Sequence, residues 1–361
     1  MLQVNPDFWK EKRVFITGHT GFKGSWLSLW LQTMGATLHG YALPAPTTPS
    51  LFEEAGVGEG VETTLADIRD FSALHSAVQI FKPDIIFHLS AQPLVRYSYA
   101  EPIETYSTNV MGTVHLLEAA RKSASVRAII NVTTDKCYEN REWVWGYREE
   151  EPMGGYDPYS SSKGCSELVT AAYRRSFFGH DGPALASARA GNVIGGGDWA
   201  QDRLIPDMLR AFQIGQPAII RNPASIRPWQ HVLEPLSCYL ALAERLFLDG
   251  NAYAEAWNFG PQDEDARTVA WIARYLADAW GPDARWQLDA RAQPHESNYL
   301  KLDISKAKAR LNYAPRWSLA TGLDHILAWH RGWLNKENAR KMCENQIAAF
   351  CAAAPDSRPD R

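Results

Sequence analysis

An alternation of short apolar runs and longer amphipathic runs dominates the first half of the chain. Each short run is rich in β-branched and aromatic residues, which is typical of a buried strand. The strands expected on this ground cover residues 13–17, 37–43, 61–66, 84–89 and 128–132. Parallel strands need connections long enough to hold a helix, so this order predicts an α/β fold with a doubly wound parallel sheet and helices on both faces.

Amphipathic segments fill the connections and much of the second half of the chain. The expected helices cover residues 25–34, 71–81, 103–123, 159–178, 203–213, 234–248, 268–280 and 319–334. Two short strands are expected at residues 218–220 and 257–259, in a region denser in Pro and Gly. A chain of 361 residues has room for one large domain or two fused domains.

Charge and composition exclude several classes of protein. The chain has 37 Lys and Arg against 41 Asp and Glu, which argues against a dedicated nucleic-acid binder. No run approaches ~18 consecutive apolar residues, so no membrane span is expected. Residues 1–13 lack the apolar core of a signal peptide, and five cysteines form no disulfide framework, so we expect a cytoplasmic protein. No Cys, His or carboxylate spacing matches a metal site.

A glycine-rich turn joins the first strand to the first helix. Three glycines at the spacing G-x-x-G-x-x-G lie in the segment Gly18-His19-Thr20-Gly21-Phe22-Lys23-Gly24. Glycines at such a turn let the backbone approach a pyrophosphate, and the helix N-terminus receives its charge. A tight turn without a ligand would need the same glycines. The position after the first strand of a βαβ series favours a Rossmann-like dinucleotide site.

The carboxylate that usually contacts the ribose 2′-hydroxyl is missing. It is expected ~20 residues after the turn, at the end of the second strand. That place reads Gly40-Tyr41-Ala42-Leu43-Pro44, with neither a carboxylate nor an Arg. The residues alone therefore allow NAD or NADP, and the missing Arg favours NAD. Asp67 and Ile68, after the third strand, are suited to line an adenine pocket.

A Tyr and a Lys lie four residues apart in the segment Tyr159-Ser160-Ser161-Ser162-Lys163. This spacing places both on one face of a helix. A phenol with a pKa of ~10 is a poor base, and a nearby ammonium lowers that pKa by favouring phenolate. Such a Tyr can take a hydroxyl proton while hydride leaves the same carbon for a nicotinamide. The pair alone would more often be a solvated helix face.

These segments together resemble the extended short-chain dehydrogenase/reductase family. The resemblance is carried by residues 18–24, His88-Leu89-Ser90-Ala91-Gln92, Thr134-Asp135-Lys136 and the Tyr159/Lys163 pair. Within the family, longer stretches resemble the CDP-glucose 4,6-dehydratases, at residues 134–143, 153–159, 189–199 and 227–232. The likeness runs from about residue 8 to about residue 333.

The resemblance implies an internal redox cycle on CDP-glucose with tightly bound NAD. The C4 hydroxyl is oxidised, water leaves across C5 and C6, and the hydride returns to C6. It implies that residues 1–190 form an NAD-binding domain to which residues 231–260 return. Residues 191–230 and 261–340 then form a smaller C-terminal nucleotide-sugar domain, followed by a tail at 341–361.

The resemblance also implies a role for each catalytic candidate. Tyr159 is the base for the 4-hydroxyl, Lys163 lowers its pKa and binds ribose, and Thr134 hydrogen-bonds the 4-oxygen. Asp135 protonates the departing 6-hydroxyl. The related dTDP-glucose dehydratases carry Glu where this chain has Lys136. Lys136 either removes the C5 proton as a neutral amine, which we prefer, or stabilises the enolate while another group acts.

Further candidates for binding are chosen by residue type and by position relative to the motifs, and for Tyr299 a simple packing role stays open. The cofactor is expected to contact Gly18, Thr20, Gly21, Phe22, Lys23, Gly24, Asp67, Ile68, Leu89, Ser90, Ala91, Gln92, Tyr159 and Lys163. The sugar nucleotide is expected to contact Asn192, Arg203, Arg221, Arg227 and Tyr299. Arg suits a diphosphate because its planar fork binds phosphate oxygens in pairs.

Two other functions remain open. A nucleotide-sugar 4-epimerase or reductase would share Thr134, Tyr159 and Lys163 but would not need the acid and base at positions 135 and 136. A non-catalytic NAD(P)-sensing module usually lacks the Tyr or the Lys. The family resemblance also implies a homodimer, or else a tetramer, paired through the helices at residues 103–123 and 159–178.

Overall fold

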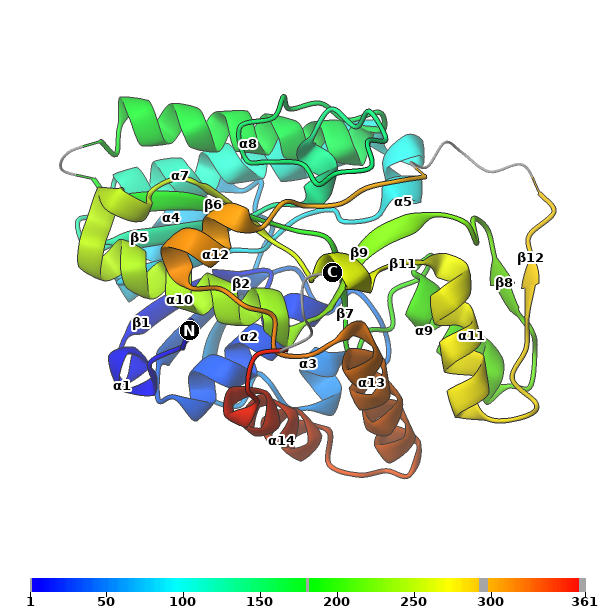
Figure 1. Cartoon of the computed structure of the whole chain (residues 1–361). Coiled ribbons are helices and arrows are strands. Elements are labelled where there is room, and N and C mark those ends of the chain that lie inside the picture. The colour runs from blue at the N-terminus through cyan, green and yellow to red at the C-terminus, as the bar shows by residue number, and fades with distance from the viewer. Residues whose placement is uncertain (1, 180–181, 292–297, 357–361) are drawn as a thin grey trace.

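A seven-stranded parallel sheet forms the centre of the computed structural model, which describes residues 2–179, 182–291 and 298–356 (Figure 1). The strands lie in the order β3 (Val61–Leu65), β2 (Thr37–Ala42), β1 (Arg13–Thr17), β4 (Ile85–His88), β5 (Ala128–Val132), β6 (Ala184–Ala190) and β10 (Ala256–Phe259). The order reverses between β1 and β4, where open α/β sheets bind their ligands. The predicted doubly wound parallel sheet is confirmed.

Helices cover both faces of this sheet (Figure 1). One face carries α2 (Phe22–Thr33), α10 (Leu233–Asp249), α12 (Ser305–Leu311) and α14 (Ala339–Ala352). The other carries α4 (Phe71–Phe81), α7 (Gly112–Arg121) and α8 (Pro158–Ser176). Side chains of β1 alternate between the two cores, since Val14 and Ile16 enter the first and Phe15 enters the second. Burial on both faces explains the nearly continuous apolar run of this strand.

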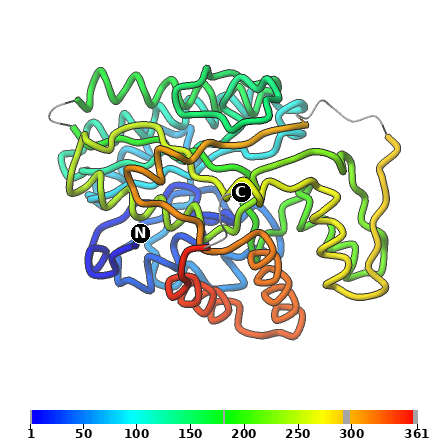
Figure 2. The backbone as a smooth tube through the Cα atoms, viewed as in Figure 1, coloured from blue at the N-terminus to red at the C-terminus, as the bar shows by residue number. Residues whose placement is uncertain are grey.

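A smaller group of elements packs beside the C-terminal ends of the strands. Its sheets contain β7 (Asn192–Ile194), β9 (Ile226–His231) and β11 (Ala266–Thr268), and separately β8 (Ala218–Ile220) and β12 (Trp286–Leu288). Its helices are α9 (Leu204–Gln213), α11 (Val269–Trp280) and α13 (Leu319–Leu334). They share a core of their own. The tube in Figure 2 shows the chain passing into this group and back to the large sheet.

Several elements differ from those expected. Strand β6 lies inside the sheet, between β5 and the edge strand β10, but was not predicted. The helix expected at residues 103–123 is divided into α6 (Pro102–Tyr106), a π-helical turn (Ser107–Met111) and α7. Residues 341–352, expected to be a tail, form most of α14, because Cys343, Ile347 and Phe350 bury an apolar stripe in the core.

The remaining short elements connect these layers. They are α1 (Pro6–Trp9), α3 (Leu51–Glu54), α5 (Val95–Ala100) and single turns at Asp135–Cys137, Gly250–Tyr253 and Asp263–Asp265. Across the residues that the structure describes, no helix combines the length and the apolar character that crossing a bilayer requires.

Candidate active site

The glycine turn lies where β1 ends and α2 begins. Gly18 has a positive φ of 76°, and a Cβ there would lie 2.8 Å from the backbone nitrogen of Ser90. A Cβ on Gly24 would lie 2.2 Å from the carbonyl oxygen of Gly18. Only glycine fits these two positions, because one needs the left-handed conformation and both are in close contact with backbone. The turn therefore presents bare backbone and a helix N-terminus, which suits a pyrophosphate.

A cavity of about 840 Å³ opens at this turn. All fourteen residues predicted to bind the cofactor line its wall. They come from the turn, from the segment after β3, from the end of β4 and from α8. The glycine cradle and the size of the cavity fit a dinucleotide. Further lining residues that the motifs did not indicate include Arg69, Tyr97, Thr108, Trp199 and Arg210.

The end of this cavity next to β3 carries an ion pair between Asp67 and Arg69. Arg69 Nε lies 3.0 Å from both oxygens of Asp67. The hydrogen bonds from Arg69 hold the pKa of Asp67 below its usual value. The Pro-rich loop after β2, with Pro44, Pro46 and Pro49, also lines this end. The prolines indicate a loop in the sequence, but no residue pattern predicts that this loop lines the site.

A second cavity of about 290 Å³ adjoins the first, between the large sheet and the smaller group of elements. Thr134, Asp135, Lys136 and Tyr159 all line it. The two cavities share the wall residues Lys23, Pro93, Leu94, Thr133, Tyr159, Asp198 and Arg203. The predicted catalytic segment therefore lies where a cofactor and a second ligand would meet.

Thr134 caps the single turn that carries Asp135. Its hydroxyl donates to Asp135 Oδ1 at 3.0 Å and accepts from the backbone N–H of Lys136 at 3.3 Å. The other carboxyl oxygen of Asp135 is buried and has no hydrogen-bond partner among the described residues. Burial raises the pKa of Asp135, against the opposing charges of Lys136, Arg227 and Lys23. A carboxyl group in this state is suited to donate a proton.

Tyr159 and Lys163 lie in the first two turns of α8, whose N-cap is Asp157. Burial raises the pKa of Tyr159 to about 12, although its hydrogen bond with Thr134 opposes this. Burial lowers the pKa of Lys163 to about 8. The amine donates to the carbonyl oxygen of Val132 at 3.4 Å. The amine of Lys163 is thus directed to the backbone in this structure, and its role in lowering the pKa of Tyr159 stays a prediction.

Not all residues predicted to bind the sugar nucleotide line the second cavity. Asn192, Arg203, Arg221 and Arg227 line the second cavity. Arg203 also pairs with Asp198 at 2.9 Å. Tyr299 lines neither cavity, and its hydroxyl donates to the carbonyl oxygen of Val144 at 3.1 Å. The structure therefore brings four of the five predicted residues together and leaves Tyr299 outside.

Comparison with known proteins agrees with this architecture. The family model described as GDP-mannose 4,6 dehydratase matches residues 15–326. The chain belongs to this family. A CDP-glucose 4,6-dehydratase of Salmonella typhimurium is 58% identical over 355 residues, covering 97% of this chain and 99% of that protein. A probable dTDP-glucose 4,6-dehydratase of Sinorhizobium fredii is 27% identical over 89% of this chain and 94% of its own length.

Solved structures share the fold of this dehydratase family member. The epimerase Mth375 of Methanothermobacter thermautotrophicus superposes with a TM-score of 0.78 at 21% identity, covering 91% of this chain and 95% of that one. A double mutant of DesIV, the dTDP-glucose 4,6-dehydratase of Streptomyces venezuelae, superposes with a TM-score of 0.73 at 25% identity. That match covers 89% of this chain and 98% of DesIV, which is described with NAD bound.

Proposed function

We propose that this protein is a hydro-lyase that converts CDP-D-glucose to CDP-4-keto-6-deoxy-D-glucose. The observation that carries the proposal is the 58% identity, over nearly the full length of both chains, to a CDP-glucose 4,6-dehydratase. The site agrees with it, because an acid, a phenol and an amine line one small cavity beside a dinucleotide-sized one.

NAD is the cofactor that fits this proposal. The glycine cradle accepts a pyrophosphate, and no Arg stands at the end of β2 to bind a 2′-phosphate. Structural relatives such as DesIV are described with NAD bound. When bound, NAD accepts hydride from C4 of the sugar and returns it to C6.

The side chains of the second cavity supply the proton transfers. Tyr159 takes the proton of the 4-hydroxyl while Thr134 hydrogen-bonds the same oxygen. A buried phenol with a raised pKa needs a cation nearby to act as a base, and Lys163, one helical turn further along α8, would supply that charge and bind the ribose of the cofactor. Asp135 then protonates the departing 6-hydroxyl, and Lys136 removes the C5 proton.

Three arginines that line the second cavity are suited to the diphosphate of the substrate. Arg203, Arg221 and Arg227 come from three different elements and line the same cavity. Asn192, at the start of β7, lies among them. The substrate is anionic while the protein has a net charge of −4, so these placed arginines must provide the local attraction.

We also propose a homodimer in the cytoplasm, with a tetramer as the larger alternative. Exposed apolar side chains lie on α6 through α8, namely Ile103, Met111, Leu168 and Phe177. Helices α7 and α8 lie side by side at the outer surface (Figure 1). All five cysteines are free, which suits a reducing compartment.

The experiment that tests the function follows product mass. The purified protein is incubated with CDP-, dTDP-, UDP- and GDP-glucose without added NAD. Loss of one water from CDP-glucose, with the other nucleotides much slower, is the expected result. Unchanged mass with an altered configuration at C4 would replace the proposal by an epimerase. Tyr159→Phe is the matched variant and should lose at least ~10²-fold in rate, since it removes the proton acceptor.

A further inference from the structure

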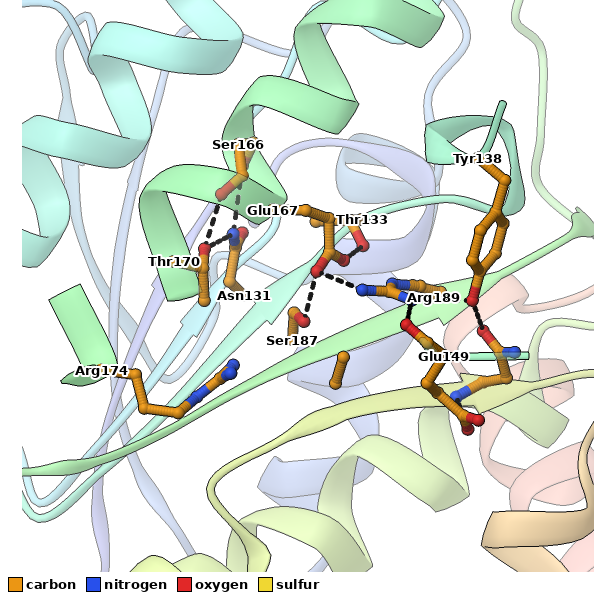
Figure 3. A network of polar contacts seen from close by, with 12 residues as sticks. Asn131, Thr133, Tyr138, Glu149, Ser166, Glu167, Thr170, Arg174, Ser187 and Arg189 are labelled. Atoms are coloured by element: carbon orange, nitrogen blue, oxygen red, sulfur yellow. Dashed lines mark hydrogen bonds and ion pairs between the residues drawn. The ribbon is translucent and has the colours of Figure 1, made fainter. Parts of the chain in front are cut away.

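A buried ion pair lies directly behind the catalytic segment (Figure 3). Glu167 of α8 and Arg189 of β6 approach to 2.8 Å, and each side chain is only 4% exposed. Neither residue lines either cavity. The pair therefore has no position from which to touch substrate or cofactor, and the resemblance assigned it no role.

The two members of the pair hold the two ends of the catalytic segment, residues 134–137. Before the segment, the hydroxyl of Thr133 donates to Glu167 Oε1. After the segment, Arg189 Nη1 donates to the hydroxyl oxygen of Tyr138 at 2.7 Å. Figure 3 shows Thr133 beside Glu167, and Tyr138 on the Arg189 side of the pair. Movement of the Glu167–Arg189 ion pair would therefore displace both ends of the catalytic segment.

Other buried groups fix the pair itself. Ser187 Oγ donates to Glu167 Oε2 at 2.7 Å, and Arg189 Nη1 also donates to the carbonyl oxygen of Glu149 at 2.9 Å. The hydroxyl of Tyr138 donates in turn to Asn258 Oδ1 of β10 at 2.7 Å. A connected buried network of this kind rigidifies the backbone that it joins. The catalytic segment is thereby tied to β6, β10 and α8.

The same glutamate acts on Lys163, which lies one helical turn earlier in α8. Burial would raise the pKa of Glu167, but Arg189 and the hydrogen bonds from Ser187 and Thr133 lower it, so the group is ionised. Its negative charge raises the pKa of Lys163, and the Cys137 thiol acts in the same direction, against the stronger effect of burial. Glu167 therefore helps to keep Lys163 a cation.

We propose that Glu167 and Arg189 are positioning residues for the dehydration: they hold residues 134–137 in the reactive geometry. The inference rests on the proposed function, because the reaction measured is the dehydration. Positioning of reacting groups is sensitive, since a displacement of ~1 Å can cost ~10²-fold in rate.

The test compares Glu167→Gln with Glu244→Gln in the full-length protein loaded with NAD. Glu244 is a second buried glutamate, which accepts from the backbone of Asn5 at 2.9 Å and from Trp9 at 2.7 Å, and it lines neither cavity. We expect Glu167→Gln to lower kcat by ~10²-fold with little change in KM. The alkaline limb of its pH profile should move to lower pH, because Lys163 loses a stabilising charge. Glu244→Gln should keep the wild-type kcat and profile.

Milder variants keep the test valid if Glu167→Gln fails to fold. Ser187→Ala removes a hydroxyl that donates to Glu167 Oε2, and Ser187 lines neither cavity. Tyr138→Phe removes the acceptor for Arg189. We expect kcat to fall by ~10-fold in each of these two variants, by analogy with the loss of one positioning contact.

The outcomes separate this inference from the proposed function. Wild-type protein that does not dehydrate CDP-glucose would contradict the proposed function. An active wild type would instead overturn the positioning role if Ser187→Ala and Tyr138→Phe both kept the wild-type kcat. Glu167→Gln with lowered thermal stability but an unchanged kcat and pH profile would likewise show that the pair is structural only.

Discussion

Among the described residues, two lysines line the second cavity, Lys136 and Lys23. Lys136 follows Asp135 in the catalytic turn and is half-buried. Lys23 lies in the first turn of α2 and lines both cavities. Burial and the charges of Arg203 and Lys163 lower the pKa of Lys23 to about 7, with Asp135 opposing them. An amine that titrates near neutral pH is suited to act as a base.

The first prediction concerns which lysine removes the C5 proton. We expect Lys136→Met to abolish exchange of the C5 hydrogen with solvent deuterium, because its amine is the proposed base. Lys23→Met is the matched variant and should retain this exchange while binding NAD more weakly. Mass spectrometry of product formed in deuterated water measures both. Exchange that persists in Lys136→Met and disappears in Lys23→Met would transfer the role to Lys23.

Most residues of the site could be predicted from the sequence because their chemistry requires recognisable residue types. The glycine turn, the acid in its turn and the Tyr/Lys pair need particular residue types at particular spacings, and all line the two cavities. Glu167 and Arg189 were missed, since they lie 22 residues apart and meet only through the packing of α8 on β6. Tyr299 was placed by type alone, and its backbone pairs with Ile226 outside both cavities.

At the scale of elements, α8 serves the site on one side and presents apolar residues to solvent on the other. Lys163 and Glu167 are buried, while the next residue, Leu168, is 60% exposed. We expect Leu168→Glu to halve the mass in solution, because it places a charge in the proposed dimer interface. Leu248→Glu changes an equally exposed leucine (65%) on α10 and should leave the mass unchanged. Light scattering measures both.

The dimer proposal fails if the wild type has the mass of one chain, or if Leu168→Glu and Leu248→Glu assemble alike. A surface charge on a helix has little effect on folding by itself, so unfolding midpoints of the two variants should agree within a few degrees. This control separates lost assembly from lost stability.

Strand β6 shows why some elements escaped prediction. Its sequence, ALASARA, contains no β-branched or aromatic residue, so the usual strand signal is absent. All seven residues are buried, between α8 on one face and α10 on the other. The close packing of both helices requires small side chains there. Helix α2 likewise begins at Phe22 rather than at residue 25, since the tight glycine turn ends at Gly21.

At the scale of the whole molecule, buried histidines determine how stability depends on pH. Burial lowers the pKa of His88 and His231 to about 3, and that of His19 and His330 to about 4. In the unfolded chain each of these histidines has its ordinary pKa of 6.5. Between pH 6.5 and the lowered pKa of the folded state, the unfolded chain therefore binds more protons than the folded chain. The contribution of these histidines to the free energy of unfolding should therefore fall as pH decreases below 6.5.

His330→Leu isolates one such contribution outside both cavities. Its free energy of unfolding should decline less than that of the wild type between pH 6.5 and about 4, because one proton fewer is taken up on unfolding. Urea titrations across this range measure the difference. Parallel curves for the two proteins would contradict the prediction. Glu234, whose pKa burial raises to about 8, has the opposite slope and is common to both proteins.

The sequence by itself determined the parallel sheet, the glycine turn suited to a dinucleotide and the reactive side chains. Each of these depends on a pattern of residues close together in the sequence. Only the tertiary structure decided that the two cavities share a wall, that Lys23 lines both, and that Glu167 and Arg189 hold the ends of the catalytic segment. These contacts join residues from different strands and helices. They depend on strand order and on the register between layers, which no local pattern encodes.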